Sequence, residues 1–251
     1  MKKQQRQQAI IQLLKQNDSV RVSTMSQKFH IVPMTIRRDL AELEKKGILI
    51  RTHGGAILKS KQTYYTSTTI YKRLKVNTEI KCQIAKKALT QLNANDHIFI
   101  ASGSTIELFA EENPNNIPLE VVTNSINVVL RLSQKKNIKI YLVGGELREK
   151  SMSMTGPIAI NVLKQLQLNK AFIGINAIDA QGHIYTSSVV ETQLLEYLST
   201  SIHPLYVLAD ASKLDKIDFI KVDLHSPYTL ITDSIPVALK ANYLEHGINV
   251  L

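Results

Sequence analysis

The stretch from Met34 to Ala56, MTIRRDLAELEKKGILIRTHGGA, joins an amphipathic helix pattern to a short apolar run and a His-Gly-Gly turn. At 100° per residue, Ile36, Leu40 and Leu43 form a narrow apolar stripe with small, polar and cationic residues opposite it. Such an outer face suits the major groove of DNA, where arginine reads guanine edges. A charged helix that merely faces solvent is the alternative. The helix residues expected to contact DNA are Met34, Thr35, Arg37 and Arg38.

Further short elements are predicted around this helix. They are a helix over 7–16, a strand over 20–22, a helix over 23–29 and, after a stop at Gly47, a strand over 48–52 and a turn at Gly54-Gly55. Their order is typical of a winged helix-turn-helix, and Arg51 and His53 on its wing are expected to contact the DNA backbone or minor groove. Val32 is a poor N-cap and lowers the stability of the helix by about 1 kcal/mol relative to Ser or Asn. Pro33 at the first helical position partly offsets this loss.

The positive charge of the chain is concentrated in its N-terminal third. The net charge is +10, and residues 1–55 hold 11 Lys and Arg against 4 Asp and Glu. Residues 56–81 hold 6 against 1, whereas residues 82–251 hold 14 against 16. A basic module joined to a nearly neutral domain is the electrostatic pattern of a nucleic-acid-binding protein.

The length of 251 residues allows two domains, each able to bury a core. We expect a winged helix-turn-helix domain over 1–57, a linker over 58–76 and an α/β domain over 77–251. The cations of YKRLKV at 71–76 could reach DNA, or they could simply lead into the helix expected over 77–92.

Composition disfavours several other classes of protein. No apolar run approaches the ~20 residues that span a bilayer, and the N-terminus MKKQQRQQ has no signal-peptide core. The single cysteine, Cys82, excludes an internal disulfide and favours a cytoplasmic protein. The histidines lack metal-ligand spacing, and no glycine-lysine or dinucleotide-binding loop is present. We therefore expect no metal and no cofactor.

From His97 onward the chain repeats a strand, a turn and a helix. The strands are short and nearly all apolar, as in a parallel sheet covered on both faces. They are IFIA at 98–101, EVVT at 120–123, IKIYLV at 138–143, AFIGI at 171–175, LYVLA at 205–209 and YTLIT at 228–232. Ligands of such sheets bind beyond the carboxyl ends of the strands.

Small polar residues follow these strands. Ser102 to Thr105 would begin a helix, and later turns place Asn124, Gly144 to Arg148, and Asp210 to Lys213 at the same edge. Backbone N–H groups and the helix dipole favour an anion there, and Ser and Thr hydroxyls complete its hydrogen bonds. A small phosphorylated metabolite fits this pattern; ordinary turns are the alternative.

These motifs resemble the DeoR family of bacterial transcriptional repressors. Beside the stretch at 34–56, the resemblance is carried in order by IFIASGSTIELFAEE, VVTNS, YLVGGELRE, SMTGP, KAFIGINAID, VVET, LADASK and LITD. It implies a winged helix-turn-helix followed by an α/β domain related to ribose-5-phosphate isomerase. It also implies a repressor of a sugar operon that a phosphorylated sugar releases from its operator DNA.

The resemblance also implies an effector site. Gly103, Ser104 and Thr105 match the loop that would hold the phosphate, and the other matching positions are Asn124, Gly145, Arg148, Glu191 and Lys213. Ala101 and Asn176 stand where the family often has Asp, and the Lys that usually follows the Glu motif is missing after Glu191. The resemblance implies that similar departures occur in the branch that controls lactose and tagatose 6-phosphate use, which suggests an inducer; an altered or lost sugar preference is the alternative.

Two other functions compete with a repressor. A sugar-phosphate isomerase with a DNA-binding arm would need an acid/base pair, and the chain offers Glu191 and Lys213 but has Asn176 in place of a carboxylate. An activator or nucleoid-type protein without an effector would bind DNA regardless of sugar phosphates. A single small winged helix buries little DNA, so we expect a homodimer or higher oligomer on a repeated or palindromic site.

Overall fold

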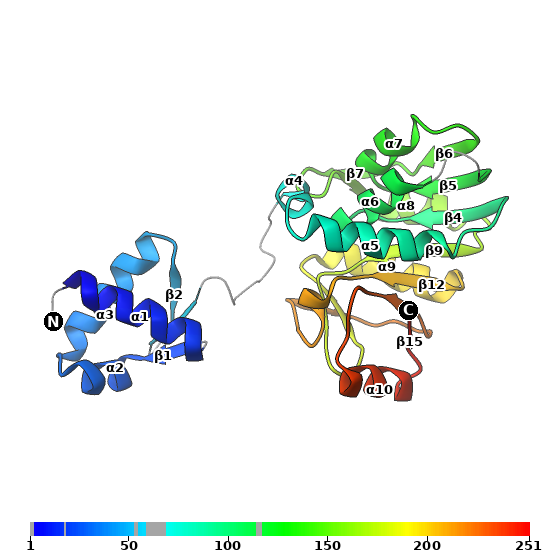
Figure 1. Ribbon diagram of the computed structural model, residues 1–251. Coiled ribbons are helices and arrows are strands. Elements are labelled where there is room, and N and C mark those ends of the chain that lie inside the picture. Colours follow the sequence, from blue (N-terminus) through cyan, green and yellow to red (C-terminus); the bar gives the residue numbers. More distant parts are fainter. Residues whose placement is uncertain (1–2, 18, 53–54, 59–68, 114–116) are drawn as a thin grey trace. The chain divides into compact units, whose positions relative to one another are not determined.

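The computed structural model describes residues 3–17, 19–52, 55–58, 69–113 and 117–251 (Figure 1). The chain divides into two compact units, Met1–Tyr64 and Tyr65–Leu251. Within the described ranges, no helix has the length and apolar character needed to cross a membrane.

The first unit is a winged helix-turn-helix, as predicted. Its elements are α1 (Lys3–Asn17), β1 (Ser19–Arg21), α2 (Val22–Phe29), α3 (Pro33–Lys45), β2 (Leu49–Thr52) and β3 (Gly55–Leu58). The strands are antiparallel in the order β1-β3-β2. Strand β3 is absent from the sequence prediction, because it begins at Gly55, which was assigned to the turn, and its four residues show no alternation.

The core of the first unit lies beneath α3. The predicted stripe of Ile36, Leu40 and Leu43 is at most 1% exposed. The stripe packs with apolar side chains of the other elements, among them Ile10, Leu14, Met25 and Leu49. Helix α3 begins at Pro33, and Val32 before it provides no side-chain cap, as predicted.

A seven-stranded parallel sheet forms the centre of the second unit (Figure 1). Its strand order is β15-β14-β12-β9-β4-β5-β6. The strands are β4 (Asp96–Ile100), β5 (Leu119–Thr123), β6 (Ile138–Leu142), β9 (Lys170–Gly174), β12 (Leu205–Leu208), β14 (Thr229–Ile231) and β15 (Asn249–Val250). All six predicted strands are therefore confirmed, and the two-residue β15 was too short to give a signal.

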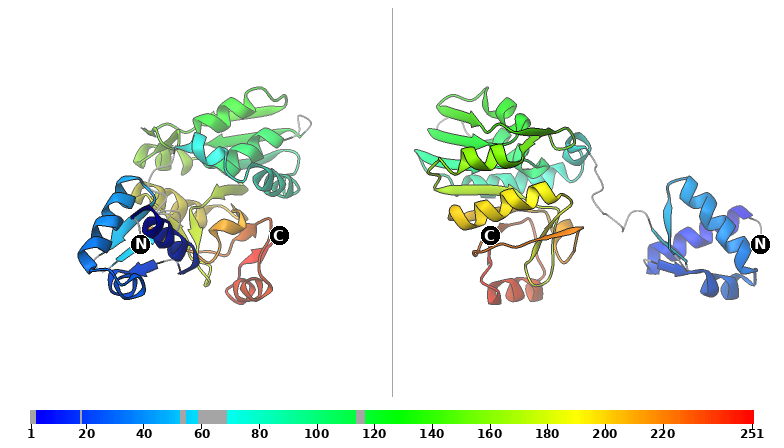
Figure 2. Two further views of the ribbon diagram at one scale, coloured as in Figure 1. Left: turned by 60° about the vertical axis from the view of Figure 1, so that its left-hand side comes forward. Right: turned by 180° about the vertical axis from the view of Figure 1, so that it is seen from behind.

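Helices cover both faces of this sheet, as its apolar strands require. Ile98 and Ile100 of β4 pack with α5 (Thr78–Leu89), α6 (Ser104–Glu112) and α7 (Ile126–Leu132). Phe99 belongs to the opposite core, which contains α8 (Pro157–Leu163), α9 (Val189–Ser201) and α10 (Val237–Glu245). Figures 1 and 2 show α5 on one side of the sheet and α9 on the other.

Short antiparallel strands beside the main sheet are missing from the sequence prediction. A hairpin joins β7 (Glu146–Arg148) to β8 (Ser153–Thr155), and a second small sheet has the order β10-β11-β13. Its strands are β10 (Ala177–Ile178), β11 (Ile184–Thr186) and β13 (Ile220–Val222). Strands of two or three residues show too little alternation to be recognised.

Helix α4 (Ile70–Leu74) lies inside the predicted linker of 58–76. Ile70 is fully buried, and its backbone N–H donates to the carbonyl of Lys150 at 2.9 Å. The linker prediction is therefore wrong for these residues, because a single buried isoleucine in a short cationic run gives no helical stripe.

Candidate functional site

The outer face of α3 carries the four residues predicted to read DNA. Arg37 and Arg38 are exposed, and Met34 is 65% exposed, while Thr35 is partly buried. They lie in the first two turns, where Pro33 has no N–H group and the N–H groups of Thr35 and Ile36 donate to the carbonyl of Val32 at 3.0 and 3.5 Å. The positive end of the helix dipole still favours a DNA phosphate there, while the side chains can reach base edges. The contacts themselves stay a prediction.

A buried ion pair fixes α3 against α1. Arg6 donates from Nε to Oδ2 of Asp39 and from Nη2 to Oδ1 at 3.2 Å, and the two side chains are 9% and 2% exposed. The hydrogen bond to Asp39 raises the pKa of Arg6, so the guanidinium stays charged. The sequence analysis missed this pair, since Asp39 lies in a polar run and Arg6 is 33 positions away.

On the wing, Arg51 is held by Glu44 of helix α3. Its Nε donates to Oε2 of Glu44 at 2.7 Å, and its backbone N–H donates to Oε1 at 2.9 Å. These hydrogen bonds, the backbone one first, lower the pKa of Glu44. The Arg51 side chain is still 48% exposed, so its predicted DNA contact stays a prediction. His53 lies outside the described residues.

In the second unit, a cavity opens at the carboxyl ends of the central strands. In the sheet, β5 and β6 lie on one side of β4, and β9, β12, β14 and β15 lie on the other. The order therefore reverses between β4 and β9, which is where open α/β sheets bind ligands. The lining residues are Arg73, Ala101, Ser102, Gly103, Ser104, Thr105, Asn124, Gly174, Ile175, Asn176, Thr186, Glu191, Leu194, Leu195 and Lys213.

Most of the predicted effector residues meet in this cavity. Those that line it are Gly103, Ser104, Thr105, Asn124, Glu191 and Lys213, whereas Gly145 and Arg148 are not among its lining residues. A Cβ on Gly145 would lie 2.4 Å from the carbonyl oxygen of Thr155, so this glycine allows the β7–β8 hairpin to close. Its φ of 141° also favours glycine.

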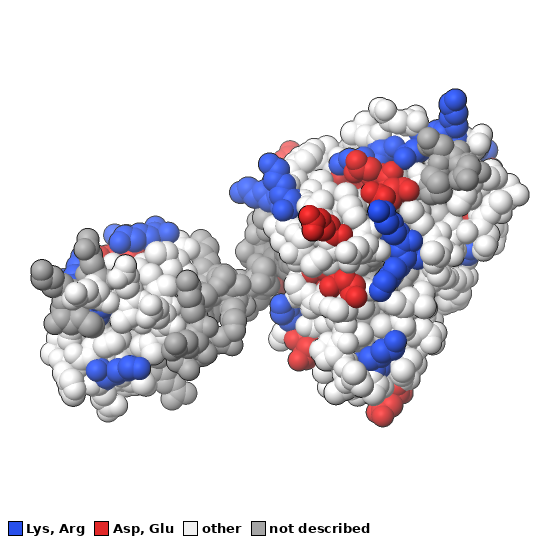
Figure 3. All heavy atoms as spheres, viewed as in Figure 1, with Lys and Arg blue, Asp and Glu red and all other residues white. Residues whose placement is uncertain are grey.

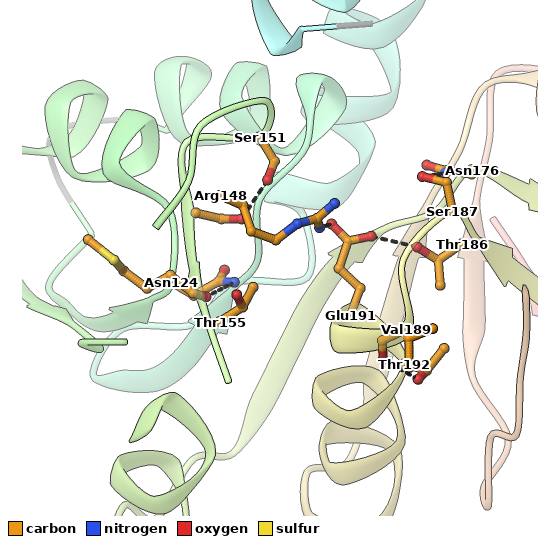
Figure 4. Close-up of polar contacts among 12 residues, drawn as sticks. Asn124, Arg148, Ser151, Thr155, Asn176, Thr186, Ser187, Val189, Glu191 and Thr192 are labelled. Atoms are coloured by element: carbon orange, nitrogen blue, oxygen red, sulfur yellow. Dashed lines mark hydrogen bonds and ion pairs between the residues drawn. The ribbon is translucent and has the colours of Figure 1, made fainter. Parts of the chain in front are cut away.

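Arg148 acts on the cavity through Glu191 (Figure 4). The guanidinium pairs with Oε1 of Glu191, and Thr186 donates from Oγ1 to Oε2 of the same carboxylate at 2.5 Å. Glu191 is thus held at a fixed orientation, and its negative charge is balanced by Arg148. The prediction that Arg148 lines the site is corrected: it lies one contact further out.

The loop between β4 and α6 forms one wall of the cavity. Gly103 precedes α6 at a φ of 145°, which favours glycine, and provides no side-chain cap. Ser104 and Thr105 follow in the first turn, 5% and 2% exposed. The hydroxyl of Thr105 has no hydrogen-bond partner in the described part of the chain. Buried hydroxyls are rarely left unpaired, so a ligand atom is the expected partner.

Asn124, which follows β5, adds a second unpaired polar atom. Its Nδ2 donates to the carbonyl of Met154 at 3.0 Å, which fixes the amide. Its Oδ1 is buried and, among the described residues, has no donor. Thr105 and Asn124 therefore offer a hydroxyl and an amide oxygen in the same cavity.

The cations Arg73 and Lys213 also line the cavity. Lys213 donates from Nζ to the carbonyl of Ile175 at 2.5 Å. Burial lowers the pKa of Lys213 to about 8, the charges of Arg73 and Lys81 add to that effect, and Asp210 opposes it. An anion in the cavity would counter the repulsion among these cations and hold Lys213 in its charged form.

Asn176 follows β9 and also lines the cavity. Its Nδ2 donates to Oδ2 of Asp218 at 2.8 Å and to Oγ of Ser187 at 3.2 Å. Asp218, which the sequence analysis did not single out, is 9% exposed. The carboxylate that the family often has at 176 is thus found next to it, supplied by the loop before β13.

Sequence reasoning missed several further lining residues. Arg73 was assigned either to DNA or to the start of a helix, and nothing in YKRLKV marks it as a cavity residue. Thr186 comes from the three-residue strand β11, and Leu194 and Leu195 come from α9. Each of these residues reaches the cavity through contacts between segments that are distant in the sequence. The sequence offers no indication of this beyond the charge of Arg73.

The second unit does not present a uniformly basic surface on the face that Figure 3 shows. On the face of the second unit seen in Figure 3, Lys and Arg lie among Asp and Glu. Across the described ranges, no group of three or more His, Cys, Asp or Glu could hold a metal ion.

Comparison with known proteins identifies both units. Residues 6–62 match the DeoR-like helix-turn-helix domain, and residues 76–234 match the DeoR C terminal sensor domain. The chain is 35% identical to the lactose phosphotransferase system repressor of Streptococcus mutans over 237 residues, 93% of each protein. It is 32% identical to the glycerol-3-phosphate regulon repressor of Escherichia coli over 216 residues, 86% of this chain and 84% of that protein.

Solved structures are similar over part of the fold. Ribose 5-phosphate isomerase A from Methanocaldococcus jannaschii has a TM-score of 0.41 at 19% identity and covers 55% of each chain. Translation initiation factor eIF2B beta from Chaetomium thermophilum has a TM-score of 0.44 at 17% identity and covers 68% of this chain and 54% of that one. With both of its domains matched in order, and with named repressors rather than enzymes among its relatives, the chain belongs to the DeoR family of transcriptional regulators.

Proposed function

We propose that this protein represses an operon for sugar uptake or breakdown, that α3 binds the operator, and that a phosphorylated sugar in the sensor cavity releases it. The observation that carries the effector site is the pair of buried, unpaired polar atoms, Thr105 Oγ1 and Asn124 Oδ1, in a cavity that Arg73 and Lys213 also line. Native proteins rarely leave such atoms unsatisfied.

The phosphate is assigned to the first turn of α6. The N–H groups of Ser104 and Thr105 and the helix dipole favour an anion, and Lys213 with Arg73 supplies positive charge. Glu191 does not repel it strongly, because Arg148 already balances that carboxylate. Burying three hydrogen-bond acceptors of a phosphate is favourable only with such donors around it.

The sugar hydroxyls are assigned to Thr186, Glu191 and Asn176, which line the same cavity. Thr186 and Glu191 form a fixed hydrogen-bonded pair there, and Asn176 is held by Asp218. Fixed polar groups select a sugar by its hydroxyl pattern, since a mismatched sugar leaves one of them unpaired. The lactose phosphotransferase system repressors among the relatives, together with Ala101 and Asn176, make tagatose 6-phosphate one of the first sugars to test.

The operator is assigned to α3 and the wing, on the basis of exposed Arg37 and Arg38 and the positive charge of the first unit. We expect two copies to bind a repeated or palindromic site, because one small winged helix makes few base contacts. Sedimentation of the protein alone and on the operator would measure the number of copies.

A melting-temperature screen tests the effector site. The full chain is heated with tagatose 6-phosphate, galactose 6-phosphate, ribose 5-phosphate or glycerol 3-phosphate, each beside its dephosphorylated form. A ligand at ~100 times its dissociation constant stabilises by about 2.7 kcal/mol, which is readily seen. We expect a phosphorylated sugar, but not its dephosphorylated form, to stabilise the protein and to release it from DNA at the same concentration. If no phosphorylated compound stabilises the protein, the proposal fails.

Thr105→Val provides a sharper test, because valine keeps the shape and removes the unpaired hydroxyl. We expect unchanged or higher stability without ligand, since no hydrogen bond is lost, and sugar-phosphate affinity weaker by about 1–3 kcal/mol. Thr192→Val is the matched control: its hydroxyl donates to Val189 outside the cavity, so that variant should keep full affinity. Thr105→Asp, which places a carboxylate at the phosphate position, should bind the operator but fail to respond to sugar.

A further inference from the structure

Helix α4 stands at the junction of the two units in the chain. It is the first described element after the wing strand β3, and it belongs to the second unit. Of its side chains, Tyr71 and Lys72 are exposed, whereas Arg73 is partly buried and lines the cavity. A five-residue helix before the sensor domain proper thus supplies a cation to the sensor site.

The turn after α4 is fixed by a buried ammonium group. Lys81 of α5 is 4% exposed, and its Nζ donates to the backbone carbonyls of Arg73 at 2.6 Å and Val76 at 2.7 Å. At the other end of the helix, the Ile70 N–H donates to the carbonyl of Lys150, and the Ile70 side chain is fully buried. The backbone that carries Arg73 is therefore held at both ends.

Positive charge is concentrated around the position of Arg73. Desolvation is the largest cause that lowers the pKa of both Lys213 and Lys81, and Asp210 raises both. The charges of Arg73 and Lys81 lower the pKa of Lys213 further, and the charge of Arg73 lowers that of Lys81. These cations repel one another; Asp210 opposes that repulsion at the two lysines, and Arg73 also interacts with the charge of Glu107. An anion in the cavity would reduce the repulsion further. Arg73 differs from the other two because it alone belongs to α4.

We propose that Arg73 binds the phosphate of the effector and thereby makes α4 the element through which an occupied sensor cavity acts on the chain segment leading to the DNA-binding unit. This rests on the proposed function. The guanidinium is suited to the role, since its donors can bind two phosphate oxygens at once with a defined geometry. Lys213 also lines the cavity, but it lies far from α4 along the chain.

The inference predicts two separate effects of removing this cation. Sugar-phosphate affinity falls, because a charge-assisted contact is lost. Release of DNA by a saturating sugar phosphate also falls, because the remaining contacts no longer engage α4. A ligand changes DNA affinity only as far as it distinguishes the two states of the protein, so the second effect is measured at saturation.

The test compares the full-length wild type with Arg73→Met, Arg73→Lys and, as a matched control, Lys72→Met. Lys72 is the exposed neighbour on α4, so this control removes the same charge without changing the cavity. The probe is the phosphorylated sugar that most raises the melting temperature of the wild type, and the DNA is a duplex selected with the wild type from a random library. Operator affinity is measured without sugar and with saturating sugar, and hydrogen exchange is followed over residues 70–79.

For Arg73→Met we expect at least tenfold weaker sugar-phosphate binding, a much smaller change in operator affinity at saturation, and no sugar-dependent slowing of exchange over 70–79. Arg73→Lys should be intermediate, and Lys72→Met should match the wild type. Normal sugar affinity in Arg73→Met would overturn the binding role, and full DNA release at saturation would overturn the coupling. If Arg73→Met does not fold, equal behaviour of Arg73→Lys and wild type overturns the inference. A wild type that responds to no phosphorylated sugar would instead refute the proposed function.

Discussion

The pH dependence of effector binding follows from the lowered pKa of Lys213. Burial brings that pKa to about 8, with Arg73 and Lys81 adding to the effect and Asp210 opposing it. A bound phosphate favours the charged form and raises the pKa, so binding takes up a proton. Because the free protein loses that proton as the pH rises through 8, sugar-phosphate affinity must fall over the same range.

The size of the effect follows from the protonated fraction of Lys213. With a pKa of about 8, this fraction is about nine-tenths at pH 7 and about one-tenth at pH 9. Affinity should therefore fall about tenfold between these pH values, which is ~1.4 kcal/mol. The phosphate itself does not contribute, because its second pKa is near 6 and it is a dianion over the whole range.

Isothermal titration calorimetry at pH 7, 8 and 9, in buffers with different heats of ionisation, measures the affinity and the proton uptake together. Lys213→Arg keeps a permanent charge and should give a nearly flat profile, and Lys213→Met should bind weakly and also without pH dependence. Lys81, whose pKa burial also lowers, is unchanged in both variants. A wild-type affinity that is constant from pH 7 to 9, or the same slope in Lys213→Arg, would refute the reasoning.

Three further substitutions test other parts of the structure. Asp39→Ala leaves Arg6 buried without its carboxylate and should lower the free energy of unfolding of the first unit, measured in urea, by about 3–5 kcal/mol. Arg6→Met combined with Asp39→Leu should recover most of that loss, and a loss below about 1 kcal/mol in Asp39→Ala would contradict a buried pair. Arg38→Ala should weaken operator binding by about 1–3 kcal/mol and relax the preference at one base pair, whereas uniform weakening over all sequences would assign Arg38 to a phosphate. Gly145→Ala should lower the stability of the sensor unit by about 1–3 kcal/mol in thermal unfolding. Effector affinity should be unchanged at a temperature where the variant is folded, and a loss of affinity without a loss of stability would show that Gly145 belongs to the effector site.

Much of the fold could be predicted because its signals are local. The Ile36, Leu40 and Leu43 stripe fixes α3 at helical spacing, and six apolar strands separated by helices specify a parallel sheet. The carboxyl-end rule then places Gly103 to Thr105 and Lys213 in one cavity without any knowledge of side-chain contacts.

The remaining features depend on contacts between distant segments. Arg148 has the charge expected of a phosphate ligand, but the hairpin that carries it directs the guanidinium to Glu191. Arg73 lies in a run that looks like a charged linker, and only the docking of Ile70 brings it to the cavity. Asp39 reads as an ordinary polar residue of the recognition helix until its partner on α1 is known. The position of a charged residue in the cavity could therefore be predicted only where the strand order determined it, as for Lys213.

The energy needed for induction is within reach of a single contact in the sensor cavity. A hundredfold loss of operator affinity corresponds to ~2.7 kcal/mol, and the effector must favour the released state of the protein by that amount. A hydrogen bond to a charged group contributes about 1.5–3 kcal/mol, so one phosphate contact made fully only in the released state would suffice. Thr105, Asn124 and Lys213 lie on elements that are further along the chain from the DNA-binding unit, so we expect their contacts to be alike in both states. Arg73 is carried by the helix nearest in sequence to the DNA-binding unit, so its contact is the one whose strength can depend on whether that unit is on DNA.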